Sequence, residues 1–122
     1  MSESPFTFNE ARIATRQAAN AQAESEHQRA QAVERYAAAE REYRKALSQT
    51  IVRLHSEGIA WTATGDIAKG EVAKLKYERD VAQGMREVAE QRAFRTGADR
   101  RSLDQLVQWS MKRELADPGS GG

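Results

Sequence analysis

Apolar and polar positions in the first half of the chain follow the spacing of one long helix. Neither proline nor glycine interrupts residues 9–57, where alanine, glutamine, glutamate and arginine, all strong helix formers, predominate. Asn9 is a suitable N-cap, and Gly58 stands where a left-handed residue ends many helices. The pattern therefore predicts a helix over about residues 9–57.

Along the second part of this predicted helix, apolar residues recur at steps of four and three. Such heptad-like spacing is typical of a helix that packs against another helix. Between Asn9 and Ala32 the stripe narrows to alanines, with Ile13 as its large member. The seam consists of Ala32, Tyr36, Ala39, Tyr43, Ala46 and Thr50, with Leu47, Ile51 and Leu54 continuing its apolar side.

The shortage of bulky apolar side chains predicts self-association. At 1.5 Å per residue the first helix would extend roughly 70 Å, more than a small globular core needs. Its alanine-rich part gains little from burial, so it either meets another chain or frays. We therefore expect a homo-oligomer held by the large seam residues, Tyr36, Tyr43, Leu47, Ile51 and Leu54.

The second half of the chain predicts a turn and two shorter helices. Residues 58–70 contain three glycines and indicate a structured turn with room for one short helical turn. Apolar spacing predicts helices over about 71–95 and 98–115, with Gly97 either breaking them apart or absorbed in a bend between them. The inner face expected for the first of these is Val72, Leu75, Ala82, Met85 and Ala89, widened by Val81 and Val88.

Together these elements predict an all-α fold. The long N-terminal helix packs as a helical hairpin or coiled coil with the two shorter helices, in one domain over residues 9–116. Residues 1–8 and 117–122 are expected to be flexible ends. The composition agrees, because 30% charged and 7% aromatic residues are more typical of long helices than of β-sandwiches.

Charge and cysteine content narrow the function classes. The net charge is only +1, from 19 basic and 18 acidic residues, so attraction to nucleic acid must come from local clustering. The absence of cysteine excludes disulfides and thiolate chemistry. Because neither a signal core nor a run of roughly 18 apolar residues is found, we expect a soluble protein of the cytoplasm that does not contact membrane.

Catalytic and metal-binding patterns are weak. The two histidines, His27 and His55, stand 28 positions apart, and the spacing of a zinc site is not found. The segment TGDIAKG lacks the spacing of a phosphate-binding loop, so we interpret it as a turn. We therefore expect a protein that is not an enzyme and uses neither cofactor nor metal.

A basic stretch at residues 92–101 is a candidate polyanion-binding surface. Arg92, Arg95, Arg100 and Arg101 are opposed there only by Asp99. Arginine binds phosphate through paired donors, and Phe94 beside it offers a ring for stacking an unpaired base. In the alternative interpretation Phe94 belongs to the core and the arginines reach solvent.

Three segments resemble, in their layout, the small phage recombination mediators of the UvsY type. They are AAAEREYRKAL with its continuation YRKALSQTIVRLHSEG, then GDIAKGEVAKLKYERDVAQGMREVAEQRA, then RTGADRRSLDQLVQWSMKRE, together covering about residues 30–114. The resemblance implies binding to single-stranded DNA without strong sequence preference, a homo-oligomer, and a RecA-like recombinase as partner. It also implies DNA contact near the end of the first helix, where Arg44, Lys45 and Arg53 stand.

The sequence thus predicts a recombination mediator that binds single-stranded DNA and assists loading of a RecA-like recombinase. One alternative is a structural or assembly protein of the virion, a scaffold or adaptor whose long helix pairs with other subunits. Another is a small regulator that binds a host protein through the alanine-rich arm. The predicted DNA-binding residues are Arg44, Lys45, Arg53, Arg92, Phe94, Arg95, Arg100 and Arg101.

Overall fold

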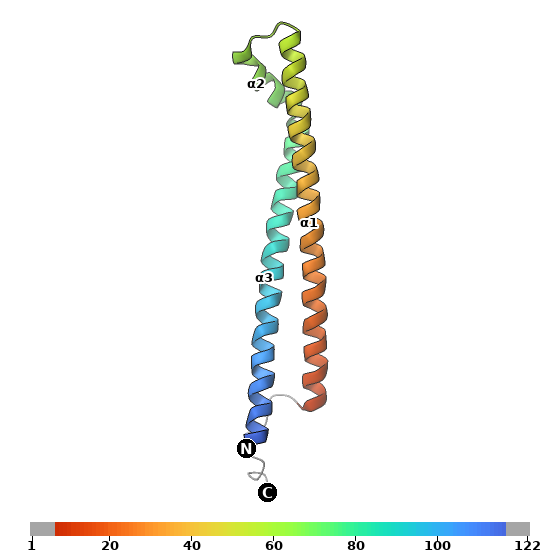
Figure 1. Ribbon diagram of the computed structural model, residues 1–122, viewed down its shortest axis with the longest axis vertical. Helices are drawn as coiled ribbons and strands as arrows, with labels where there is room; N and C mark the ends of the chain where they lie inside the picture. Colours follow the sequence, from red (N-terminus) through yellow and green to blue (C-terminus); the bar gives the residue numbers. More distant parts are fainter. Residues whose placement is uncertain (1–6, 117–122) are drawn as a thin grey trace. The chain divides into compact units, whose positions relative to one another are not determined.

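The computed structural model describes residues 7–116, which form three helices and no strand. Helix α1 spans Phe8–Ser56, α2 spans Trp61–Glu71 and α3 spans Ala73–Ala116 (Figure 1). The all-α class and the hairpin-like packing of the long helix are confirmed. Of the ends predicted to be flexible, residues 1–6 and 117–122 lie outside the described residues, whereas Phe8 already belongs to α1.

Helix α1 begins with a reciprocal cap rather than at the predicted N-cap. The backbone N–H of Glu10 donates to Thr7 Oγ1 (3.1 Å), and the N–H of Thr7 donates to Glu10 Oε2 (3.2 Å). This capping box satisfies two free backbone donors at once. The predicted cap at Asn9 is therefore wrong, and Asn9 Oδ1 instead accepts from Arg12 Nη2 at 3.0 Å.

The end of α1 follows the prediction at Gly58. This glycine adopts a φ of 91°, in the left-handed region. Its N–H donates to the carbonyl of His55 (3.0 Å), and the N–H of Ile59 donates to the carbonyl of Leu54 (3.1 Å). The pair of bonds is a Schellman motif, which satisfies carbonyls that the helix end would otherwise leave open.

Helix α2 occupies the segment predicted to be a turn. Thr64 and Ala68 are fully buried (0% exposed), and Val72 follows them at the same step of four (5% exposed). The glycines of this segment suggested a turn, but a glycine inside a helix costs only about 1 kcal/mol. Burial of this stripe of small side chains offsets that cost, so the turn prediction is wrong.

Helix α3 is continuous where two helices were predicted. Gly97 lies inside it, and one series of buried or half-buried positions continues past Gly97 at alternating steps of three and four. Such a heptad pattern keeps one side of a helix against its neighbour. The seam of α3 consists of Val72, which precedes the helix, and Leu75, Arg79, Ala82, Arg86, Ala89, Ala93, Thr96, Arg100, Leu103, Val107 and Ser110.

The chain forms two compact units, in each of which a segment of α1 lies beside a segment of α3 (Figure 1). Unit 1 joins Met1–His27 with Glu90–Gly122, described over 7–27 and 90–116, and unit 2 is Gln28–Ala89. Their cores differ in content. Buried side chains in unit 2 are Tyr43, Leu54, Thr64, Ala68 and Val72, and in unit 1 they are Ser25, Ala93 and Ser110.

Candidate nucleic-acid interface

An open groove with a positive lining runs along one side of unit 2. It has a volume of about 750 Å³. Four of the lining side chains are cationic and one, Glu40, is a carboxylate. Helix α1 supplies Val33, Tyr36, Ala37, Glu40, Arg41, Arg44, Lys45 and Ser48, and α3 supplies Arg86.

The groove follows from the periodicity of α1. Val33, Ala37, Arg41 and Lys45 succeed one another at steps of four, which places them along one side of the helix, next to the seam. The short side chains of Val33 and Ala37 leave space, whereas Arg41 and Lys45 are long and exposed. The result is a shallow surface with basic groups that an extended anion can reach.

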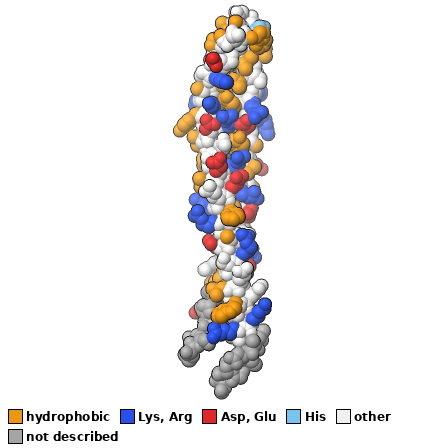
Figure 2. Space-filling model, turned by 90° about the vertical axis from the view of Figure 1, so that its left-hand side faces the viewer, with side chains coloured by type: hydrophobic (Ala, Val, Ile, Leu, Met, Phe, Trp, Pro, Cys, Tyr) orange, Lys and Arg blue, Asp and Glu red, His pale blue; other side chains and the backbone are white. Residues whose placement is uncertain are grey.

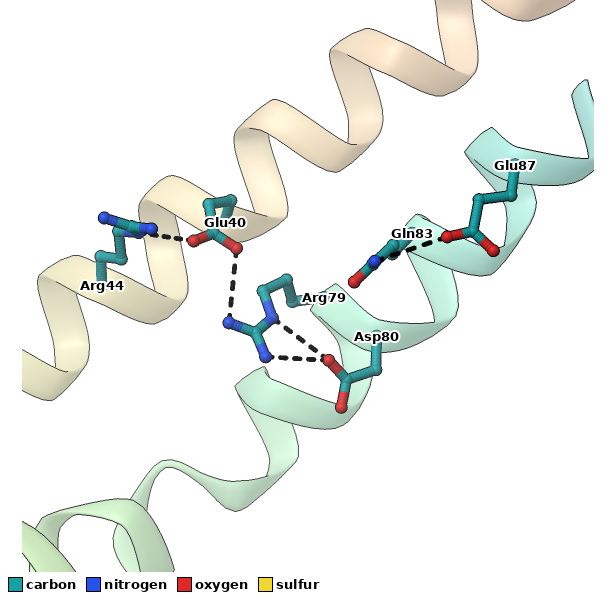
Figure 3. A network of polar contacts seen from close by, with 6 residues as sticks. All are labelled: Glu40, Arg44, Arg79, Asp80, Gln83 and Glu87. Carbon is teal, nitrogen blue, oxygen red and sulfur yellow. Dashed lines mark hydrogen bonds and ion pairs between the residues drawn. The ribbon is translucent and has the colours of Figure 1, made fainter. Parts of the chain in front are cut away.

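Glu40 organises the arginines beside the groove (Figure 3). Its Oε1 accepts a hydrogen bond from Arg44 Nε, and its Oε2 lies 3.5 Å from Arg79 Nη1. The hydrogen bond from Arg44, followed by the positive charges of Arg44 and Arg79, holds the pKa of Glu40 below its usual value. The carboxylate therefore stays ionised, and the Arg44 side chain, though paired, remains 77% exposed.

Arg79 has a second acidic partner and a ring beneath it. Its Nε and Nη2 donate to Asp80 Oδ1 at 3.2 and 2.9 Å, and this bond is the main cause of its raised pKa. The Arg79 guanidinium carbon also lies 4.5 Å from the centre of the Tyr43 ring. Arg79 is thus engaged within the chain and is a positioning group for Glu40.

Arg86, on the wall of the groove, repeats this stacking one heptad later. Its guanidinium carbon lies 4.4 Å from the centre of the Tyr36 ring. Tyr36 and Tyr43 are seven positions apart, and so are Arg79 and Arg86, so equal steps along the antiparallel helices preserve the pairing. Cation–π contact holds each guanidinium against the ring face of its tyrosine.

The residues predicted to mediate oligomerisation contribute to the interior of unit 2. Tyr43 and Leu54 are buried, at 7% and 5% exposure, and Tyr36, Leu47 and Ile51 are half-buried. Most of their apolar surface is therefore covered within a single chain. Their predicted role between chains stays a prediction, but unit 2 packs them without a second copy.

Arg53 lies apart from Arg44 and Lys45 and is not among the residues that line the groove. It forms ion pairs with Glu57, at 3.0 Å, and with Glu71 at the end of α2. The hydrogen bond to Glu57, then the one to Glu71, raises its pKa. Two carboxylates thus balance its charge, and its contacts link the ends of α1 and α2.

The basic stretch at residues 92–101 lies entirely within α3. Phe94 is 75% exposed, which contradicts its alternative placement in the core. Arg92, Arg95 and Arg101 are exposed. Arg100 is half-buried in the seam, where its Nη1 donates to Gln22 Oε1 (2.7 Å) and its Nε lies 3.9 Å from Asp104.

The helical spacing divides these five residues among different sides of α3. Phe94 and Arg101 are seven positions apart and share one side, and Arg92 and Arg95 are three apart and share another. Arg100 points into unit 1. Because the cations do not converge, this stretch is a weaker anion site than the groove in unit 2.

Sequence reasoning missed Arg41 and Arg86 as groove residues. Arg41 stands one helical turn before Arg44 and Lys45, which is a signal that the sequence contains. Arg86 is different, because its place depends on how α3 is aligned with α1. The matching steps of seven between the tyrosines and Arg79 and Arg86 were the available signal for that register.

Other binding chemistry is not found over the described part of the chain. Residues 7–116 contain no group of three or more His, Asp or Glu side chains placed to hold a metal ion. Within the same range, no helix combines the length and the apolar character needed to cross a membrane. Comparison with protein-family models, with curated proteins and with solved structures gives no match.

Proposed function

We propose that this chain is a binding protein that holds single-stranded DNA in the groove of unit 2 and mediates the loading of a RecA-like recombinase. The observation that carries the DNA part is the lining of the groove, where four cations meet one carboxylate that is already paired. Phosphates neutralised there release condensed counterions, which drives binding.

The openness of the groove favours a single strand over a duplex. Exposed arginine and lysine side chains reach successive phosphates without reading a sequence. Arginine also stacks on base faces, which an unpaired strand exposes and a duplex hides. We therefore expect weak sequence preference and tighter binding to single-stranded than to double-stranded DNA.

Fluorescence anisotropy of a labelled oligonucleotide, measured at several salt concentrations, tests this proposal. Arg41→Gln combined with Lys45→Gln removes two groove cations. We expect affinity to fall at least about tenfold and the salt slope to decrease by about 1.4, since each single-strand phosphate contact contributes about 0.7.

The matched control combines Lys69→Gln with Lys112→Gln, which changes the net charge equally at exposed positions outside the groove lining. We expect this control to bind nearly as the original chain does. Equal losses in both double variants would mean that binding follows net charge, and the groove proposal would be wrong.

The role of a mediator rests only on the resemblance in layout to UvsY-type proteins and needs its own assay. A RecA-like recombinase hydrolyses ATP once it has assembled on single-stranded DNA, and a coat of single-strand-binding protein slows that assembly. We expect the chain to shorten this lag, and the groove double variant to shorten it less. A DNA-binding chain that leaves the lag unchanged would not be a mediator.

The alternative of a structural or assembly protein is favoured by a different observation. Large apolar side chains on the outer side of α3 are exposed, which suits packing against another protein. If the chain binds no DNA even at low salt, the DNA-binding proposal is wrong and the structural or assembly role is favoured.

A further inference from the structure

Four large apolar side chains lie exposed on α3 within unit 2. They are Tyr77 (69% exposed), Val81 (43%), Met85 (53%) and Val88 (56%), and we call them the α3 stripe. The sequence pattern had placed Val81, Met85 and Val88 on the inner face, and their exposure corrects that prediction. Single exposed apolar residues are common, but four on successive turns of one side mark an interaction surface.

The stripe lies away from the seam because arginines occupy the inward positions. Arg79 and Arg86 face α1, where they stack on Tyr43 and Tyr36. Val81 lies two positions after Arg79, and Val88 lies two positions after Arg86, which is more than half a turn around the helix. In Figure 2, which shows the α3 side, hydrophobic side chains stand among basic and acidic ones.

The order of residues along the stripe is symmetric about Val81. Tyr77 stands four positions before it and Met85 four after it. When two copies of the stripe lie antiparallel with Val81 on the two-fold axis, Tyr77 of each copy faces Met85 of the other. A thioether against an aromatic ring is a favourable contact, and both ends of the pairing gain it.

The position of Lys74 agrees with the same antiparallel register. Lys74 stands seven positions before Val81, on the same side of the helix, so it lies opposite Val88 of the other copy. The apolar part of the lysine side chain covers Val88 while its ammonium group reaches water. A parallel arrangement would place Lys74 beside Lys74, which is repulsive.

Gly84, within the stripe, permits close approach of the two helices. A Cβ atom at this exposed position would meet no atom of the chain within 4 Å. Its lack of a side chain leaves a depression on the stripe between Tyr77 and Val88. Glu87 remains exposed, with Oε1 accepting a long hydrogen bond from Gln83 Nε2 at 3.5 Å (Figure 3).

We propose that the α3 stripe is a homodimer interface, in which two copies of this chain pair antiparallel about Val81. The stripe complements its own reversed order, with Tyr77 facing Met85 and Lys74 facing Val88, which commits the surface to a second copy rather than to an unrelated partner. The proposal does not depend on DNA binding, and its interface differs from the α1 residues that the sequence suggested.

Disulfide trapping tests the two-fold axis directly, because the chain contains no other cysteine. In the full chain, Val81→Cys places two thiols at the axis. We expect mild oxidation to convert most of this variant to a covalent dimer. Val52→Cys is the control, since Val52 is more exposed (66%) but lies on α1. Equal cross-linking of the two variants would overturn the proposal.

A mixed experiment tests the direction of pairing. Tyr77→Cys and Met85→Cys are prepared separately, one with a tag that changes its size, and oxidised alone or mixed. Antiparallel pairing predicts mostly Tyr77–Met85 cross-links in the mixture and few within either variant alone. The reverse result would mean parallel pairing and would contradict the proposed register.

Light scattering of the unmodified chain supplies the remaining test. We expect a dimer at micromolar concentration and a monomer for Val81→Glu, with the helical circular dichroism unchanged because Val81 is a surface residue. A monomeric unmodified chain overturns the proposal, and so does an oligomer that Val81→Glu leaves intact. These readouts contain no DNA, so they fail or succeed separately from the oligonucleotide titration.

Discussion

Glu40 sets how much positive charge the groove presents. Its carboxylate pairs with Arg44 and with Arg79, so it both orients Arg44 and cancels part of the field that a phosphate would meet. If the groove binds DNA as proposed, stability and DNA affinity make opposite demands on Glu40. A single substitution can separate the two.

Replacement of Glu40 by glutamine is expected to strengthen DNA binding while it weakens the fold. The variant removes the negative charge of the groove, so we expect the dissociation constant for a single-stranded oligonucleotide to fall roughly twofold to fivefold. Thermal unfolding should move to lower temperature because the ion pairs are lost. Anisotropy and circular dichroism measure the two effects, and weaker DNA binding would show that orientation of Arg44 matters more than charge.

The lowered pKa of Glu40 predicts a particular pH dependence of stability. A carboxyl group with a lowered pKa in the folded chain stabilises the fold above its ordinary pKa, near 4.5, and loses that effect as the pH falls through the folded value. The melting temperatures of the original chain and of Glu40→Gln should therefore differ at neutral pH and converge in acid. A difference that persists in strong acid would rule out the ion pairs as its cause.

At the scale of the elements, two glycines have opposite effects. Gly58 ends α1 with a positive φ, a conformation that costs other residues roughly 1–2 kcal/mol. We expect Gly58→Ala to lower the free energy of unfolding by about that amount, as measured by urea denaturation. An unchanged value would mean that the Schellman motif contributes little to this end of the helix.

Replacement of Gly97 by alanine is expected to change the free energy of unfolding in the opposite direction to Gly58→Ala. It lies within α3, and a Cβ atom there would meet Arg101 Nη1 at 3.5 Å and Gln22 Nε2 at 3.6 Å, which are ordinary contacts with the ends of flexible side chains. Alanine is the better helix former by about 1 kcal/mol. Gly97→Ala should therefore raise the free energy of unfolding by up to that amount, and a decrease would indicate that the space beside Gln22 is needed.

The sequence predicted elements well where local chemistry decides them. The extent of α1 followed from a long run without glycine or proline and from Gly58 at its end. Helix α2 was missed because its three glycines indicated a turn, while its stability comes from buried contacts at Thr64 and Ala68. The break predicted at Gly97 is absent because the seam continues through it.

The candidate site was predictable only in part, for a related reason. Arg44 and Lys45 are neighbours on one helix, so the sequence alone brings them together. Arg86 joins them through the alignment of two helices, which apolar spacing did not reveal because Arg79 and Arg86 occupy inward positions usually held by apolar residues. For the same reason Val81 and Val88 were placed inward. A pattern of apolar positions assigns the inner face to valine, whereas in α3 arginine occupies that face and the valines are exposed.

At the scale of the whole molecule, the two units differ in how much large apolar surface they bury. Unit 2 buries Tyr43, Leu54 and Val72, whereas the buried residues of unit 1 are the small Ala93, Ser25 and Ser110. Free energy of local opening rises with buried apolar area. We therefore expect the described residues of unit 2 to be more stable against local opening than those of unit 1.

Hydrogen exchange of the backbone amides should reveal this difference. We expect amides in residues 43–54 and 68–79 to exchange slowest, and the helical amides of unit 1 to exchange at least about tenfold faster, since a difference of about 1.4 kcal/mol in opening free energy suffices. Mass spectrometry of peptic fragments measures this. Uniform protection along α1 would contradict the expectation.

The repeated stacking of Arg79 and Arg86 on Tyr43 and Tyr36 makes the pairing of α1 with α3 specific. A foreign helix with leucines at the corresponding places would strand two guanidinium groups against aliphatic side chains, whereas the chain's own α1 offers a ring at each interval. We therefore expect α3 to pair with its own α1 in preference to other helices that carry apolar heptads. Two kinds of side chain, spaced seven residues apart, supply this preference.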